Sequence, residues 1–166
     1  MNTRFLAPAV FAAGILIAAA PPAPAKVKPP VDPVASAVKP STVEREVRQM
    51  FEDYFKTVER HELKNFLAFF AAGEDLTVFE DKEMYDWKGF VVFAEGFFQQ
   101  VAEIKFDHEK CTVNPIGPGV AVATGVFRAA GKTTSGEPVA IRNSYTFVLL
   151  KQGDRWRIKH VHESSL

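Results

Sequence analysis

The chain has 166 residues, of which 47% are hydrophobic, 24% are charged and 15 are phenylalanine. This composition is that of a globular protein, and the length suits one domain with a substantial core. Twenty basic residues balance 20 acidic ones, so no net charge attracts the chain to nucleic acid or to anionic lipid, and we expect neither as a partner.

The amino terminus has the pattern of a secretory signal peptide. A short basic segment precedes the apolar residues 5–20, and small residues lead up to Ala25. We therefore expect residues 1–25 to be a signal peptide cleaved after Ala25, which places the mature protein in the periplasm or outside the cell, free of the membrane. The apolar run is shorter than the roughly 20 residues of a membrane-spanning helix, and an uncleaved anchor is the alternative.

Residues 26–40 are dense in proline, alanine, valine and lysine. Because proline removes hydrogen-bond donors and holds the backbone extended, this composition predicts a semi-rigid linker, and the folded domain then covers residues 41–166. The single cysteine, Cys111, excludes an internal disulfide and is typical of a small buried residue on a strand.

The first helix is predicted to begin after Ser41, which forms a capping box with Glu44. Apolar residues then recur at steps of three and four, as on the buried stripe of an amphipathic helix. The stripe comprises Val43, Val47, Met50, Phe51, Tyr54, Phe55 and Val58. Tyr54 therefore lies on the buried side, where its hydroxyl needs a partner.

A second helix is expected over residues 62–72, followed by a strand over residues 76–80 that carries Glu80 on the same face as Val78. Residues 81–86 read as a charged loop. A third helix then begins after the capping residue Asp86.

Beyond residue 102 the sequence alternates as strands do, with turn residues between the segments. The strands are expected over residues 103–113, 120–130 and 138–151 and from residue 155 to the carboxyl end. Helices followed by a run of antiparallel strands are typical of an α+β fold. A curved sheet folded over three helices encloses a cone, whose mouth is the natural ligand pocket.

The last strand carries the most informative pattern. A period of two places Trp156, Ile158, His160 and His162 on one face and the charged residues, with Val161, on the other. Because Trp156 and Ile158 belong against a core, we expect both imidazoles to point into the cone.

This ending, Thr146-Phe147-Val148-Leu149 followed by Gly153 and Trp156-Arg157-Ile158-Lys159-His160-Val161-His162-Glu163-Ser164, resembles the SnoaL-like group of the nuclear transport factor 2-like (ketosteroid isomerase-like) superfamily. It is also similar to the association domain of calcium/calmodulin-dependent kinase. The resemblance covers residues 41–166. It implies a cystatin-like α+β barrel, with a strongly curved antiparallel sheet packed on three helices, and a homodimer formed through the outer face of the sheet. The superfamily holds isomerases, dehydratases and members without chemistry, so the fold alone does not imply an activity.

The resemblance to ketosteroid isomerase implies that Tyr54 steadies an oxyanion and that Glu80 is the general base. The isomerase also needs a protonated acid on a later strand, and at the matching place this chain has Thr146 and Phe147. The alternative is that Tyr54 is a core residue and Glu80 a carboxylate at a strand end that bonds to a neighbour.

His160 and His162 have three interpretations: contacts to a small ligand or general acid/base groups, ligands of a metal together with His108 or Glu80, or structural residues. Arg142 either lines the cone, where it suits a ligand carboxylate, or lies on the outer face. Trp87 either covers the core beside the third helix or stacks on a ligand.

Taken together, these patterns favour an exported SnoaL-like homodimer that binds a small, mostly apolar ligand through Tyr54, Trp87, Arg142, His160 and His162. The alternatives are a ketosteroid isomerase-like isomerase or dehydratase that uses Tyr54, Glu80 and His160 in general acid/base chemistry, and a non-catalytic dimerisation module. No metal and no cofactor is expected.

Overall fold

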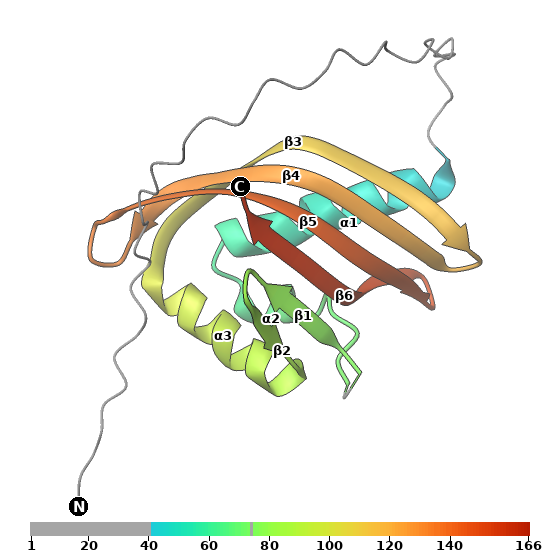
Figure 1. Ribbon diagram of the computed structural model, residues 1–166, viewed down its shortest axis with the longest axis horizontal. Coiled ribbons are helices and arrows are strands. Elements are labelled where there is room, and N and C mark those ends of the chain that lie inside the picture. The colour runs from blue at the N-terminus through green and yellow to red at the C-terminus, as the bar shows by residue number, and fades with distance from the viewer. Residues whose placement is uncertain (1–40, 74) are drawn as a thin grey trace, which may run out of the picture. The chain divides into compact units, whose positions relative to one another are not determined.

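The computed structural model describes residues 41–73 and 75–166, so the predicted signal peptide and linker lie outside the described residues. The elements, in chain order, are α1 (Thr42–Glu59), α2 (Leu63–Leu67), β1 (Thr77–Glu80), β2 (Glu83–Tyr85), α3 (Trp87–Gln100), β3 (Val101–Gly117), β4 (Val120–Thr133), β5 (Pro138–Gln152) and β6 (Arg155–Ser165). Figure 1 shows the long strands arching over α1, with β1, β2, α2 and α3 below them.

The first helix forms as predicted. The Ser41 hydroxyl accepts a hydrogen bond from the Glu44 backbone N–H (3.1 Å), and the Glu44 carboxylate accepts one from the Ser41 N–H (2.7 Å). This capping box satisfies two backbone donors that the first turn leaves free. The helix buries the predicted stripe from Val47 to Val58 and ends before His61, whose φ of 58° is left-handed.

The second helix is much shorter than predicted. It ends at Leu67 because the backbone of residues 69–71 pairs with β6 instead of continuing the helical hydrogen bonds. The Ile158 N–H donates to the Phe69 carbonyl and the Ala71 N–H donates to the Ile158 carbonyl, each at 2.8 Å. A tertiary contact with the last strand therefore overrides the local helical pattern.

The segment predicted as a charged loop contains a strand, and the loop prediction for residues 81–86 was wrong there. Asp81 takes a left-handed φ of 51°, which turns the chain so that β2 pairs antiparallel with β1. The third helix begins as predicted, with the Asp86 carboxylate accepting a hydrogen bond from the Gly89 N–H at 2.8 Å.

The strands form one six-stranded sheet in the order β2-β1-β6-β5-β4-β3. Every neighbouring pair is antiparallel except β1 and β6, which run parallel. The sheet is strongly curved but not closed, since β2 and β3 are its edges. The predicted α+β architecture is confirmed.

The core lies between the concave face of this sheet and the helices, and aromatic rings dominate it. Phe147, Leu149 and Ile158 are fully buried on β5 and β6, against Val47 and Phe51 of α1. Across the described ranges, no helix is both long and apolar enough to cross a membrane.

Candidate functional site

A β-bulge in β6 determines which side chains enter the cone. Leu149 pairs with Ile158 and Val148 with His160, so Lys159 is an extra residue in β6. The extra residue reverses the alternation of faces that follows it. The Lys159 ammonium forms an ion pair with the Asp75 carboxylate.

The prediction that His160 and His162 point into the cone was wrong. Their partners Val148 and Thr146 lie on the outer face of β5, between the buried residues of the inner face. On that outer face the ring of Phe79 contacts both imidazoles, at centroid distances of 6.0 Å to His160 and 5.9 Å to His162. Partial burial, and next the neighbouring His162, lower the pKa of His160.

The bulge instead turns Val161 and Glu163 inward. Glu163 is the direct partner of Glu80 in the parallel pairing of β1 with β6, so their carboxyl groups share the concave face. The end of this pair is held by Asp81, whose N–H donates to the Glu163 carbonyl (3.0 Å) and whose carboxylate accepts from the Ser165 N–H (2.7 Å).

Burial dominates the electrostatics of the two carboxyl groups. It raises the pKa of Glu163 well above 4.5, the Glu80 charge adds to the effect, and a hydrogen bond from the Asn143 side chain opposes it. Burial and then the Asp81 charge raise the pKa of Glu80 to about 7. The pair therefore retains a proton to a higher pH than exposed glutamates do, and Glu80 is close to half-protonation near neutral pH.

Tyr54 lies close enough to this pair for its phenol to respond to the charges of both carboxyl groups. Its side chain is only 7% exposed, and burial, followed by the charges of Glu163 and Glu80, raises the pKa of its phenol. The structure thus brings together the predicted Tyr54 and Glu80. The rings packed around Tyr54 belong to Phe51, Phe55, Phe66, Phe69, Phe70 and Phe147.

The sequence patterns did not predict that two polar residues, Glu163 and Asn143, lie in this interior. Regular alternation assigns Glu163 to the outer face, and only the bulge brings it inward. Asn143 is 5% exposed, and its side-chain oxygen has no hydrogen-bond partner. The available signal was Val161, an apolar residue that regular alternation leaves among the charged residues of the outer face.

Arg142 and Trp87 lie away from this interior. Arg142 is on the outer face, where its guanidinium donates two hydrogen bonds to Glu109, at 3.0 and 2.9 Å, and Arg128 binds the same carboxylate. This resolves the two alternatives for Arg142 in favour of the outer face. Trp87 is the first residue of α3, half-buried and packed against the core.

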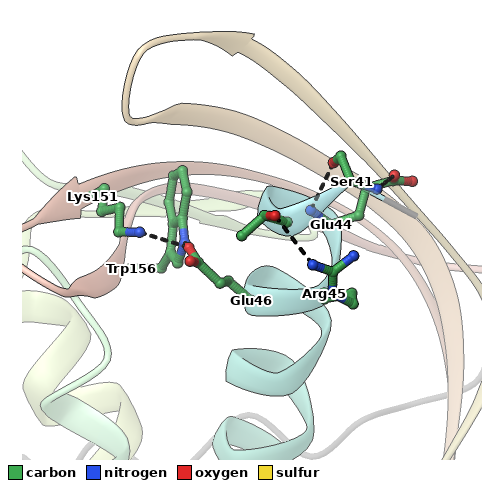
Figure 2. A network of polar contacts seen from close by, with 7 residues as sticks. Ser41, Glu44, Arg45, Glu46, Lys151 and Trp156 are labelled. Carbon is green, nitrogen blue, oxygen red and sulfur yellow. Dashed lines mark hydrogen bonds and ion pairs between the residues drawn. The ribbon is translucent and has the colours of Figure 1, made fainter. Parts of the chain in front are cut away.

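An open groove of about 870 Å³ runs along the exposed side of α1 and the start of β6. Trp156 lies at its edge, and Figure 2 shows how Glu46 connects this indole to α1. The Glu46 carboxylate accepts hydrogen bonds from the indole N–H at 2.8 Å and from Lys151 at 2.7 Å. Tyr54, Glu80 and Glu163 do not line this groove.

The described parts of the chain contain no group of three or more His, Cys, Asp and Glu side chains placed to hold a metal ion. The polar groups of the interior are ones that donate and accept hydrogen bonds. The carboxyl groups of Glu80 and Glu163, the Tyr54 phenol and the Asn143 amide lie in this interior, together with many aromatic rings.

Comparison with solved structures identifies the same architecture elsewhere. A candidate association domain of calcium/calmodulin-dependent protein kinase II from Xanthomonas campestris matches with a TM-score of 0.66 and 20% identity, over 84% of this chain and 98% of that one. A nuclear transport factor 2-like superfamily protein from Salmonella enterica matches with a TM-score of 0.67 and 15% identity, over 75% and 91%. A candidate scytalone dehydratase from Novosphingobium aromaticivorans gives a TM-score of 0.67 at 15% identity, over 74% and 83%.

At these identities the structural likeness establishes the fold and not an activity. No curated protein matches the chain in sequence. The sequence of residues 47–166 matches the model of the SnoaL-like domain, and this chain belongs to the SnoaL-like family.

Proposed function

We propose that this protein binds a small, mostly apolar molecule bearing a carbonyl or carboxyl group at the rim of the cone, through the Glu80–Glu163 pair. The observation that carries the proposal is the convergence of these two carboxyls beside Tyr54. A protonated carboxyl donates a hydrogen bond to a ligand oxygen, and the aromatic rings offer an apolar surface beside it.

The approach of the ligand follows from burial. Aromatic rings occupy the centre of the cone around Tyr54, whereas Glu80 and Glu163 both retain some exposure to solvent. The ligand therefore enters at the ends of β1 and β6 and places its oxygen between the carboxyls, with its apolar part against the rings.

Carboxyl ¹³C NMR tests this proposal with cyclohexanone, cyclohexanecarboxylic acid and, as a probe without a polar group, methylcyclohexane. The first two are expected to shift the Glu80 and Glu163 resonances in the wild-type protein, and methylcyclohexane much less. Glu163→Gln removes the effect, whereas Glu83→Gln, at an exposed position on β2, retains it. Shifts that spare both carboxyls while other residues respond would contradict the proposal.

The same pair supports a second candidate function, general acid/base catalysis of the isomerase or dehydratase type. Glu80, with a pKa of about 7, is matched to removing a proton at neutral pH, and the raised pKa of Glu163 favours the protonated form of the carboxyl beside it. Glu163 thereby supplies the acid that the isomerase comparison lacked at Thr146 and Phe147.

Deuterium exchange tests the catalytic proposal. Exchange of the α-protons of cyclohexanone in D₂O is followed by ¹H NMR, and Glu80→Gln is expected to slow it by at least about 100-fold, the usual contribution of a general base. Tyr54→Phe slows it by less, because the phenol acts on the oxygen and not on the proton. Deuterium exchange that is no faster with the wild-type protein than in buffer, or equally fast with wild type and Glu80→Gln, would contradict catalysis and leave ligand binding as the proposed function.

We further propose that the protein is a homodimer paired through the outer face of the sheet. The centre of that face, on β4 and β5, carries uncharged, half-buried side chains such as Val126, Thr146 and Val148. Light scattering is the measurement: Val148→Glu is expected to give a monomer, and Val92→Glu, at an exposed apolar site on α3, is the control that stays dimeric. A monomeric wild type refutes the dimer.

Export is proposed on the sequence of residues 1–25 alone. Amino-terminal sequencing of protein recovered from a periplasmic fraction or from the medium is expected to begin at Lys26. A product that begins at Met1 in the membrane fraction would indicate an uncleaved anchor instead.

A further inference from the structure

A second β-bulge places His108 and Cys111 on the same face of β3. His108 pairs with Phe127 of β4 and Lys110 with Val126, so Glu109 is the extra residue. In a regular strand, residues three apart point to opposite faces. Here the bulge turns both the imidazole and the thiol toward the concave side.

Cys111, Gly125 and Tyr145 form one row across β3, β4 and β5. Because Gly125 has no side chain, the Tyr145 ring lies over it, and a Cβ at this position would collide with the Tyr145 hydroxyl and the Lys110 carbonyl. The gap therefore lets the phenol reach across β4 to the thiol. Burial and the neighbouring Cys111 both raise the pKa of Tyr145.

The Tyr145 hydroxyl lacks a well-formed hydrogen bond. Its side chain is only 3% exposed, and its oxygen is one of two buried side-chain atoms in the described residues without a partner. Buried hydroxyls in native proteins are normally hydrogen-bonded, so such an atom indicates a place for an incoming group.

These groups line a pocket of about 150 Å³ between α1 and β3, which is distinct from the Glu80–Glu163 site. Its walls are Arg48, Phe51, Glu52, His108, Cys111 and Tyr145. An apolar cavity of about this volume accommodates benzene, so the pocket suits a molecule of a few heavy atoms. Arg48 is anchored to the strand by a hydrogen bond of 2.9 Å from its guanidinium to the Cys111 carbonyl.

We propose that this pocket is a thiol-modification site, in which Cys111 forms a reversible mixed disulfide with a small zwitterionic aminothiol of the size of cysteine. Arg48 and Glu52, one helical turn apart, carry opposite charges at the pocket. The guanidinium binds the carboxylate of the adduct, the Glu52 carboxylate binds its ammonium group, and the Tyr145 hydroxyl donates to the adduct.

The exchange consumes one small-molecule disulfide and needs no other oxidant. The Cys111 sulfur attacks one sulfur of the disulfide, the new S–S bond forms as the old one breaks, and the leaving sulfur takes the electron pair. The Cys111 proton passes to His108 and then to the departing thiolate. One free thiol is released for each adduct formed, and a reducing thiol reverses the reaction.

His108 is suited to accept that proton because its imidazole is largely neutral near pH 7. Burial against the Phe55 ring, at a centroid distance of 4.4 Å, lowers the pKa of His108. The charges of Asp107, Glu52 and Glu59 act in the opposite direction and are weaker.

Intact-mass spectrometry of the full chain tests the proposal with three disulfides: cystine, cystamine, which carries only ammonium groups, and dithiodipropionate, which carries only carboxylates. Cystine is expected to react at least about tenfold faster than the other two, and dithiothreitol is expected to remove its adduct. Cys111→Ser, checked for folding by circular dichroism, forms no adduct.

Variants separate a built site from a thiol that is merely accessible. Arg48→Gln removes the preference of cystine over cystamine, and Glu52→Gln removes its preference over dithiodipropionate. Arg45→Gln and Asp53→Asn, on the same helix but outside this pocket, leave both preferences intact. His108→Gln slows all three reactions at pH 7.

Two results would overturn the proposal. The first is a folded wild-type protein that forms no cystine adduct although the denatured chain does, which would mean that the pocket is closed to the thiol. The second is equal reactivity toward all three disulfides that the Arg48, Glu52 and His108 variants leave unchanged, which would mean that Cys111 is accessible but lies in no binding site.

Discussion

Glu80 and Glu163 occupy the same level of the sheet as direct partners in the parallel pairing of β1 with β6. Two carboxyls so placed, and withdrawn from water, resist carrying two negative charges at once. The pair therefore retains a proton at a pH where exposed glutamates have lost theirs.

The first prediction concerns the dependence of stability on pH. The pKa of Glu80 rises from 4.5 in the unfolded chain to about 7 in the folded one, so folding favours the protonated form. The stabilising contribution of Glu80 to the free energy of unfolding is fully present below about pH 4.5 and is lost as the pH rises through about 7. The free energy of unfolding, from urea titrations at a series of pH values, should fall across this window by on the order of 3 kcal/mol. Glu163 adds to the fall in the same direction.

Glu80→Gln removes the part of this decline that Glu80 contributes, and it makes the variant more stable than the wild type above pH 7. Glu83→Gln, at an exposed position on β2, is the matched control and leaves the slope unchanged. A wild-type stability that is flat or rises between pH 4.5 and 8 would show that the carboxyls are not buried as described.

The bulge at Lys159 predicts unequal costs for neighbouring substitutions in β6. Val161 is 4% exposed on the concave face, and its replacement by alanine should cost about 1–3 kcal/mol of unfolding free energy. His162, exposed on the opposite face, should tolerate alanine within about 0.5 kcal/mol. Regular alternation predicts the reverse order, so chemical denaturation of the two variants distinguishes the two registers.

The surroundings of Gly125 and Gly96 predict opposite effects on stability when each glycine is replaced by alanine. Gly125→Ala forces a methyl group against the Lys110 carbonyl and the Tyr145 hydroxyl, and we expect a loss of at least about 2 kcal/mol in unfolding free energy. Gly96→Ala, in α3 with no atom near its new methyl group, should instead stabilise the protein by about 0.5–1 kcal/mol. A tolerated Gly125→Ala would mean that Tyr145 does not lie across β4.

The contact of Glu46 with Trp156 predicts a fluorescence change. Hydrogen bonds from Lys151 and then from Trp156 lower the pKa of Glu46 below 4.5, so their stabilisation is present above pH 4.5 and is lost as the pH falls. In a Trp87→Phe background, which leaves one indole, Glu46→Gln should shift the emission at pH 7 to longer wavelength. Gln49→Ala, on the same helix, is the control without a shift, and an unchanged Glu46→Gln spectrum would contradict the contact.

Much of the architecture follows from local patterns in the sequence. The capping residues Ser41 and Asp86 start their helices where expected, and the order of helices and strands identified the fold class. The errors occur where tertiary pairing decides the backbone. The second helix ends early because residues 69–71 bond to β6, and β2 exists because it pairs with β1.

The composition of the site was less predictable, for one physical reason. A bulge adds a single residue without altering the alternating composition on either side of it, so the faces of His160 and Glu163 cannot be assigned from periodicity alone. Tyr54 and Glu80 precede any bulge and were assigned to the correct face. Glu163, Asn143 and the Cys111–Tyr145 contact all depend on strand register, which only the assembled sheet provides.

The parallel pairing of β1 with β6 has a consequence for biogenesis. Thr77 finds its partner, His160, only in the final strand of the chain, and that strand separates β1 from β5 in the finished sheet. Until β6 has formed, β1 and β2 have no neighbour on that side. Joining β1 to β5 through β6 therefore requires contacts between residues far apart in the sequence, which makes it a slow step of folding, and the unpaired edge of β1 is open to aggregation until that step is complete.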